Sequence, residues 1–178
     1  MIDDILDLAS IDAGAMQLEL TTVDLAEVIG ESLDAVADKL ERFQIKTKVK
    51  IAKGAESLIG DPVRIRQILY NLISNAVSVS PDGGTIKIEA AKKDTMLELS
   101  VADQGPGVDA TLRASIFERF EGTGSSERSR GAGLGLSIVK SFVELHGGTV
   151  KVTDAGKRGA KFVCRLPAEP VQDLQAAE

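Results

Sequence analysis

The residues with the clearest chemical potential form the segment Asp103-Gln104-Gly105-Pro106-Gly107. It follows an alternating run at residues 97–102, and alternate side chains of a strand share one face. Asp103 therefore falls on the apolar face of that run, where an unpaired carboxylate would be costly. The glycines that follow allow a sharp turn and the close approach of a ligand. Two interpretations stay open here: a carboxylate that lines a pocket, or a strand-end Asp that caps its own turn.

A second polar pattern lies on a helix that Asp61-Pro62 is expected to open, with Pro at the first helical position. Its polar stripe, at steps of three and four residues, is Arg64, Gln67, Asn71, Asn75 and Ser78. Asn is a poor helix-interior residue, and a merely solvated face would more often carry Glu, Lys or Arg. The two Asn side chains therefore favour ligand contacts, and an amide oxygen suits a hard cation such as Mg²⁺.

A third pattern, Gly131-Ala132-Gly133-Leu134-Gly135, leads into a helix. A glycine-rich helix N-terminus binds anions through its free N–H groups and its dipole. Asp103 could accept a hydrogen bond from an amine, and Asn75 could bind a metal ion. An amine acceptor, a metal ligand and a phosphate cradle together describe a site for a nucleoside triphosphate with Mg²⁺.

Hydrophobic periodicity predicts the elements that must position these groups. Residues 1–20 read as the tail of a long helix, with Ile2, Leu6, Ala9, Ala13 and Met16 as its apolar seam. A capping box at Asp24 predicts a helix to about Arg42. Another expected helix begins at residue 61 and extends at least to residue 78. Further helices are expected over residues 109–120 and from the glycines at 131–135 to about residue 146. The expected strands cover 44–52, 57–60, 85–91, 96–102, 149–153 and 160–166.

This order predicts an α+β fold, a two-layer α/β sandwich with one mixed sheet of about five strands and three helices on one face. Residues 121–132 are rich in Gly, Ser and Arg without a hydrophobic period, so we expect a mobile loop. Residues 168–178 are expected to form a disordered tail.

The composition of the chain limits the classes of protein to which it can belong. The chain has 178 residues and a net charge of −6, which argues against a nucleic-acid surface. The single cysteine, Cys164, lies in a strand pattern and is expected to be a buried structural thiol. No apolar run approaches the length of a membrane span and no signal peptide is visible. We therefore expect a cytoplasmic domain without direct membrane contact, although a longer parent could still be anchored.

In their order and spacing these motifs resemble the catalytic, ATP-binding domain of sensor histidine kinases, within the superfamily of gyrase and the large heat-shock chaperone. Residues 61–76 resemble its N box, residues 103–107 and 131–140 its two glycine boxes, and residues 116–120 its F box. The resemblance implies the Bergerat ATP-binding fold over residues 21–167. Residues 1–20 resemble the end of the dimerisation hairpin that carries the phosphoacceptor histidine.

The resemblance also implies roles for particular residues. Asp103 would bind the adenine amine, and Asn75 would bind Mg²⁺. Residues 121–132 would form the ATP lid, in which Arg128 or Arg130 could reach the γ-phosphate. The full set of implied nucleotide contacts is Asn71, Asn75, Asp103, Gly105, Gly107, Phe120, Gly131, Gly133, Leu134 and Gly135. The implied reaction is transfer of the γ-phosphoryl group of ATP to a histidine on the hairpin, and then to a response-regulator receiver domain, within a homodimeric parent.

Two departures from the family pattern keep alternatives open. The only histidine, His146, lies before a glycine pair and not on a hairpin helix, so the phosphoacceptor must belong to another segment. Ser78 and Val79 replace the Lys and aromatic residue that usually continue the N box. One alternative is therefore a pseudokinase that acts by allostery and partner binding. A water-using ATPase fits less well, because Asn71 stands where such enzymes carry a Glu base. A serine kinase of the anti-sigma type shares the boxes but lacks the hairpin remnant that residues 1–20 resemble.

Overall fold

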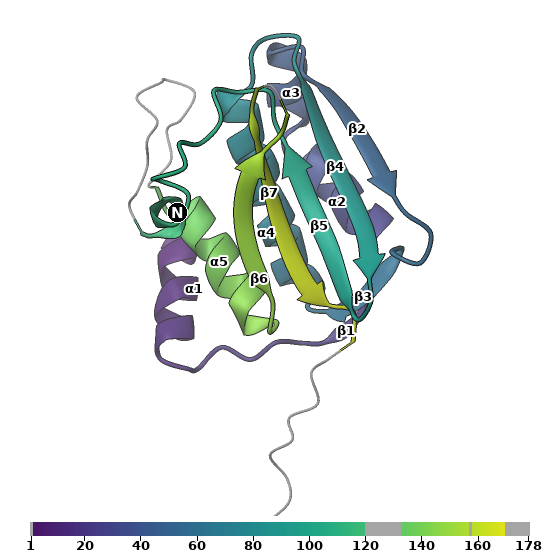
Figure 1. The fold of residues 1–178 in the computed structure, drawn as a ribbon. Helices are drawn as coiled ribbons and strands as arrows, with labels where there is room; N and C mark the ends of the chain where they lie inside the picture. The colour runs from purple at the N-terminus through teal and green to yellow at the C-terminus, as the bar shows by residue number, and fades with distance from the viewer. Residues whose placement is uncertain (1, 120–132, 157, 170–178) are drawn as a thin grey trace, which may run out of the picture.

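The computed structural model shows a five-stranded mixed sheet that is covered on one face by helices (Figure 1). It describes residues 2–119, 133–156 and 158–169. The sheet has the order β2-β4-β5-β7-β6, in which β2 runs parallel to β4 and every other pair is antiparallel. Its strands are β2 (Lys46–Ile51), β4 (Thr85–Lys93), β5 (Met96–Ala102), β6 (Thr149–Asp154) and β7 (Ala160–Pro167).

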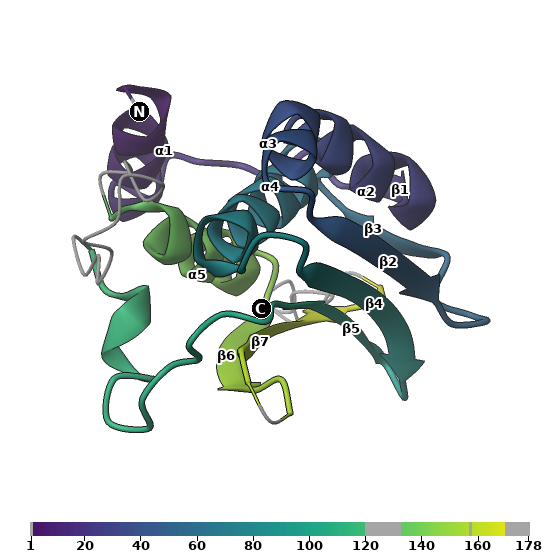
Figure 2. The same ribbon diagram turned by 90° about the horizontal axis from the view of Figure 1, so that it is seen from above.

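The helices form the second layer, seen edge-on in Figure 2. They are α1 (Ile2–Asp12), α2 (Leu25–Asp34), α3 (Ala37–Arg42), α4 (Pro62–Val79) and α5 (Gly135–Leu145). Helix α4 contacts both α2 and α5 and so lies at the centre of the layer. The predicted α+β sandwich with a five-stranded mixed sheet is confirmed. Among the described residues, none of the helices combines the length and the apolar character needed to cross a bilayer.

The core lies between the two layers and follows the predicted periodicities. Ile86 and Ile88 of β4 are fully buried, whereas Lys87 between them is exposed on the other face. Helix α4 contributes its whole apolar face, of which Ile65, Ile68, Leu69, Leu72 and Ile73 have no exposed surface. Cys164 of β7 is also fully buried, and burial raises the pKa of its thiol to about 12, so the prediction of a structural cysteine is confirmed.

Helix α4 begins as the sequence indicates. The Asp61 carboxylate accepts hydrogen bonds from the backbone N–H groups of Val63 and Arg64 at 3.0 and 3.2 Å, and Pro62 follows it at the first helical position. These bonds satisfy two N–H groups that would otherwise lack helical partners.

Three local expectations were wrong, each for a local reason. The N-terminal helix ends at Asp12 because Gly14 adopts a left-handed conformation with φ of +63°. The helix that starts at Asp24 breaks into α2 and α3 around Val36, which is buried with φ of −116°. Residues 109–119 form turns and only a short 3₁₀ helix, η1 (Ser115–Phe117), because the Asp109 carboxylate accepts bonds from the amide and hydroxyl of Thr111.

A small second sheet was missed. Strand β1 (Thr21–Asp24) pairs antiparallel with β3 (Ser57–Gly60). Only Val23 of β1 is buried, so four residues gave no alternating pattern to detect. This ladder holds the chain segment after α1 beside the N-terminus of α4.

Candidate nucleotide-binding site

Asp103 stands immediately after β5 with only 3% of its surface exposed. Its Oδ1 atom accepts hydrogen bonds from the backbone N–H groups of Gly105 at 2.8 Å and Ala160 at 3.1 Å. Burial raises the pKa of this carboxyl, and the two N–H donors act in the opposite direction. Both donors engage the same oxygen, which leaves Oδ2 as the atom that can accept from a ligand amine.

Gly105 is required by the packing around this carboxylate. A Cβ atom there would lie 2.8 Å from the carbonyl oxygen of Val79, at the end of α4, and 3.0 Å from Oδ1 of Asp103. Gly107 adopts φ of +81° and faces the backbone of Gly159. The glycines of this segment therefore bring β5, α4 and the β6–β7 connection into close contact around Asp103.

Gly159 packs directly against the Asp103 backbone, a contact that the sequence analysis missed. A Cβ atom there would lie 2.0 Å from the carbonyl oxygen of Asp103, and φ is +92°. The next residue, Ala160, donates its N–H to the Asp103 carboxylate and accepts from the Asp103 N–H at 2.9 Å. A glycine immediately before an alternating strand was the available signal, but only the pairing of β5 with β7 shows which residue it faces.

Helix α4 carries Asn71 and Asn75, both half-buried. Asn71 Oδ1 would lie 3.4 Å from a Cβ atom on Gly135, so this side chain faces the start of α5. Its Nδ2 atom is buried and has no hydrogen-bond partner among the described residues. An unsatisfied buried donor costs free energy, so the position suits a ligand oxygen as its partner.

The N-terminus of α5 supplies the third part of the site. Gly133 adopts φ of +69°, Leu134 is buried, and α5 begins at Gly135 without a side-chain cap. Its first N–H groups are therefore not satisfied by a capping side chain, as an anion site requires.

Helix α4 connects the two ends of the site. Val79 contacts the Asp103 end, Asn71 contacts the α5 end, and Asn75 lies midway between them. Eight residues of helix separate the ends by about 12 Å. The structure thus brings together Asp103, Gly105 and Gly107 at one end and Asn71 and Gly135 at the other. Phe120, Arg128, Arg130 and Gly131 lie outside the described residues.

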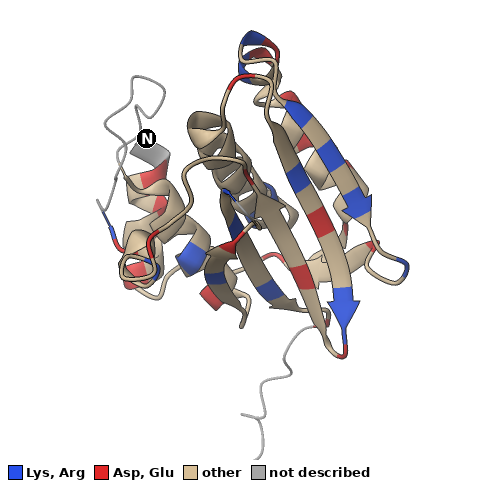
Figure 3. Ribbon diagram, turned by 45° about the horizontal axis from the view of Figure 1, so that its top comes forward, with Lys and Arg blue, Asp and Glu red and all other residues tan. Residues whose placement is uncertain are grey.

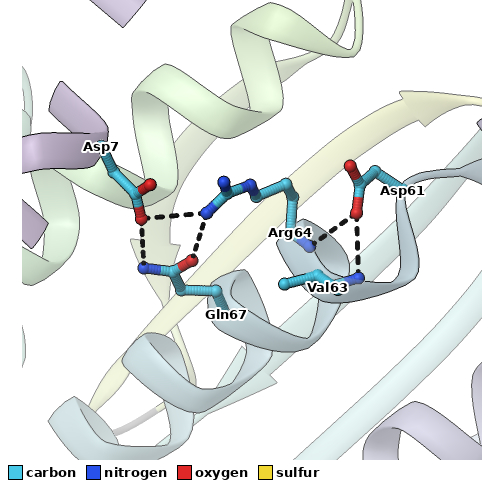
Figure 4. Close-up of polar contacts among 5 residues, drawn as sticks. All are labelled: Asp7, Asp61, Val63, Arg64 and Gln67. Carbon is cyan, nitrogen blue, oxygen red and sulfur yellow. Dashed lines mark hydrogen bonds and ion pairs between the residues drawn. The ribbon is translucent and has the colours of Figure 1, made fainter. Parts of the chain in front are cut away.

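Helix α1 contacts the N-terminal half of the same polar stripe (Figure 4). The Asp7 carboxylate pairs with Arg64 at 2.9 Å and accepts from the Gln67 amide at 3.2 Å. The Arg64 guanidinium also lies 5.0 Å from the centre of the Phe142 ring of α5. Leu8 is buried at this contact, whereas Leu6 of the predicted seam is 60% exposed. Residues of the stripe nearest α1 therefore bind protein, and those nearest β5 remain available to a ligand.

His146 joins two helices and belongs to the framework of the site. Its Nε2 atom accepts from the backbone N–H of Asp61 at 3.1 Å, and its Nδ1 atom contacts the carbonyl oxygen of Phe142 at 2.7 Å. These roles assign the tautomer with the proton on Nδ1. Burial lowers the pKa of this imidazole.

The next feature of the site is its capacity to bind a metal ion. Within the described parts of the chain, no cluster of three His, Cys, Asp or Glu side chains could hold a metal ion.

Comparison with known proteins agrees with this geometry. Residues 60–170 match the family described as histidine kinase-, DNA gyrase B-, and HSP90-like ATPase. The chain belongs to this ATPase family. The matched range of this ATPase domain includes α4, the Asp103 turn and the start of α5.

The relatives of this ATPase domain include histidine kinases and a sensor protein. The sensor protein DivL of Caulobacter vibrioides is 35% identical over 167 residues, which cover 93% of this chain and 21% of DivL. A crystal structure of full-length ShkA in complex with AMPPNP has a TM-score of 0.83 and 31% identity, and the match covers 96% of this chain and 35% of that one.

A structure of the histidine kinase ThkA in complex with the response regulator protein TrrA has a TM-score of 0.73 and 26% identity, with 94% and 49% of the two chains covered. The predicted kinship with histidine-kinase ATP-binding domains is confirmed. The chain spans only 12–33% of the length of five of its curated relatives, DivL among them.

Proposed function

We propose that this domain binds ATP with Mg²⁺ and transfers the γ-phosphoryl group to a histidine on a dimerisation hairpin. The observation that carries the proposal is the buried Asp103 carboxylate, whose Oδ1 is fixed by two backbone N–H groups while Oδ2 can accept from an amine. The unsatisfied Nδ2 of Asn71 supports a ligand oxygen at the opposite end of α4. A purine amine at one end and phosphates at the other match this spacing.

The chain's own groups would bind and orient the substrate. Asp103 would select an exocyclic amine, Gly105 and Gly107 would let the base approach the backbone, and the α5 N-terminus with Gly133 and Gly135 would hold phosphate oxygens. Mg²⁺ would neutralise charge on the phosphates when bound, with Asn75 as its protein ligand. Arg128 and Arg130 are proposed as further donors to the γ-phosphate.

We also propose a division of the chain. Residues 1–20 would be the end of the hairpin's second helix, residues 21–167 the catalytic domain, and residues 168–178 a tail. The boundary at residue 168 lies too early, because Ala168 donates to the Thr95 carbonyl and accepts from the Ile59 N–H, so the catalytic domain extends at least to Ala168. In the full-length parent the hairpin would form a homodimer, and a response-regulator receiver domain would accept the phosphoryl group, since ThkA is described in complex with such a regulator.

The decisive experiment mixes this chain with a separately produced hairpin from its parent and γ-labelled ATP. Label should appear on the hairpin and disappear after acid treatment, because phosphohistidine is acid-labile. Asp103→Asn should abolish transfer at low ATP concentrations. Calorimetry on the same samples separates the alternatives: binding without transfer would favour the pseudokinase, and no binding would contradict both.

One observation favours the pseudokinase alternative. Ser78 donates its hydroxyl to the carbonyl oxygen of Ser74 at 2.9 Å, and Val79 packs against Gly105. Neither position offers a cation to the phosphates, which weakens the charge complementarity of the site.

The metal assignment has its own test. Asn75→Ala should weaken binding of Mg-ATP more than binding of ATP in excess chelator, because the lost amide oxygen is the proposed metal ligand. Titration calorimetry in both buffers measures the difference. Equal losses would assign Asn75 a role in packing or direct phosphate contact.

A further inference from the structure

The face of the sheet that no helix covers carries an unusual charge pattern. Ile86 and Ile88 of β4 point toward the helices, so Lys87 and Glu89 lie on the open face, and the strand register extends this alternation across all five strands. The cations on this open face are Lys46, Lys48, Lys50, Lys87, Lys93, Lys151, Lys161 and Arg165. Figure 3 shows them along the strands, most densely on β2.

Charge is therefore segregated on this protein. Glu89 and Glu98 are the only carboxylates that the register places on the open face, which gives it a net charge of +6. The whole chain has a net charge of −6, so the remainder carries −12. A polyanion would be attracted to the sheet face and repelled by the rest of the surface.

The two carboxylates neutralise only part of the open face. Lys161 pairs with Glu89 at 2.8 Å, while Lys93 and Arg165 share Glu98. The hydrogen bonds from Lys161 and Lys93 lower the pKa values of Glu89 and Glu98 respectively. Five lysines make no ion pair within the described part of the chain: Lys46, Lys48, Lys50, Lys87 and Lys151.

Protection of sheet edges explains only some of these lysines. Exposed edge strands often carry Lys to prevent pairing with another chain, and β2 and β6 are the edges here. Lys87 lies on β4, and Lys161 and Arg165 lie on β7, both internal strands. Of these three, Lys161 and Arg165 pair with Glu89 and Glu98, so Lys87 is the internal cation that neither edge protection nor an ion pair within the described residues explains.

The composition of the open face indicates the partner. It has seven Lys and one Arg, and none of its side chains is aromatic. Protein interfaces are depleted in Lys and enriched in Arg and aromatic residues, and single-stranded nucleic acid is held by aromatic stacking. Hydrated ammonium groups spread over two dimensions suit the headgroups of an anionic bilayer. A cavity of about 270 Å³ lies in the other layer, between α2 and α4, away from this charged face.

We propose that the open sheet face is an electrostatic docking surface for membranes that contain anionic lipids. This changes the expectation of no direct membrane contact, which came from the lack of an apolar span. An apolar span is needed to cross a bilayer, whereas a basic surface is enough to bind one peripherally. The net charge concealed this surface, because only the strand register shows which side chains share the face.

Vesicle flotation with the whole chain tests the proposal. Vesicles of phosphatidylcholine alone are compared with vesicles that also contain phosphatidylglycerol, at low and high salt. The chain should partition onto the anionic vesicles alone and dissociate at high salt. Each unpaired lysine is expected to contribute about a fivefold change in the partition coefficient. The triple variant K46Q/K48Q/K50Q should therefore lose on the order of 100-fold.

A matched control removes three charges from the helical layer, as K39Q/R42Q/R66Q. It changes the net charge equally but should reduce partitioning only slightly. Equal losses in the two triple variants would overturn the proposal, because net charge alone would then explain binding. Absence of preference for anionic vesicles would overturn it directly, and thermal unfolding verifies that each variant is folded.

Two further measurements distinguish an anionic membrane from other polyanionic partners. K87Q/K151Q, from an internal strand and the far edge, should lose on the order of 25-fold. No loss in that variant would mean that only the β2 edge binds, which contradicts a planar partner. Duplex or single-stranded DNA that competes as well as anionic vesicles at equal charge would assign the face to nucleic acid instead.

Discussion

The two ends of the candidate site differ in how complete they are without a ligand. At the Asp103 end, the carboxylate is buried and already accepts two backbone hydrogen bonds, and three glycines fit closely around it. At the Asn71 end, a buried amide nitrogen has no partner among the described residues, and α5 starts without a side-chain cap.

The difference suggests two strategies of recognition. The first end is preorganised, so a base would meet a rigid acceptor and little entropy would be lost there. The second end leaves polar groups unsatisfied, so it gains most when oxygens of a ligand arrive. Substitutions at the first end should therefore affect folding and base selection. Substitutions at the second end should raise the stability of the ligand-free domain while lowering its affinity for nucleotide.

The largest expected effect is at the preorganised end. Gly159→Ala should destabilise the fold by about 3 kcal/mol or more, because the new Cβ would overlap the Asp103 carbonyl and φ is positive. Gly156→Ala is the control, since Gly156 also has positive φ but nothing within 4 Å of its Cβ position. Denaturant unfolding should give a much smaller loss for Gly156→Ala. Similar losses would mean that backbone strain alone acts at both positions.

Next in size is the loss of base recognition. Asp103→Asn keeps an oxygen that can accept from the Gly105 and Ala160 amides, so the fold should persist. The other position becomes an NH₂ donor that opposes the ligand amine. ATP affinity should fall by about 1.5–3 kcal/mol, as expected for a hydrogen bond to a charged group. Titration calorimetry measures it, and an unchanged dissociation constant would refute the assignment of the base to Asp103.

These two residues also show how far the sequence was informative. Asp103 was identified because strand alternation put a carboxylate on an apolar face, and α4 because Asp61-Pro62 and its apolar spacing marked it. Gly159 was missed because its importance arises from a contact with residue 103, across the pairing of β5 with β7. Local patterns reveal periodicity and caps, but they do not reveal which backbones meet.

This limit of local sequence patterns also explains the other differences between the predicted and the observed structure. Strand β1 is four residues long with one buried side chain, too short for a periodic signal. The Asp109–Thr111 hydrogen bonds replaced a predicted helix with turns, a competition between side chain and backbone that hydrophobic spacing does not measure. The contact of Asp7 with Arg64 and Gln67 joins residues about sixty positions apart and had no signal in the sequence.

A smaller change in stability, opposite in sign to that of Gly159→Ala, is expected at the Asn71 end. Asn71→Leu replaces an amide whose buried Nδ2 atom has no partner among the described residues by an apolar side chain of similar size. The ligand-free domain should become more stable by up to about 1 kcal/mol, while Mg-ATP affinity falls. Unfolding without nucleotide and calorimetry with it give the two numbers. A loss of stability would show that Asn71 is already satisfied in the free protein.

The smallest effect at neutral pH concerns His146, which holds the N-terminus of α4 in the neutral form. Its folded-state pKa is lowered by burial, so between that pKa and the unfolded value of about 6.5 the unfolded chain binds more protons. Its contribution to stability is thus present above pH 6.5 and is lost as the pH falls through the folded pKa.

His146→Gln removes this titration, and its amide can still accept from the Asp61 N–H. The difference in unfolding free energy between wild type and His146→Gln, measured from neutral to mildly acid pH, should shrink as the pH falls. Taking the difference cancels the carboxylates that titrate in both proteins. A difference that stays constant with pH would mean that the imidazole is equally protonated in the folded and unfolded states, and the bond from Asp61 would then not depend on its neutral form.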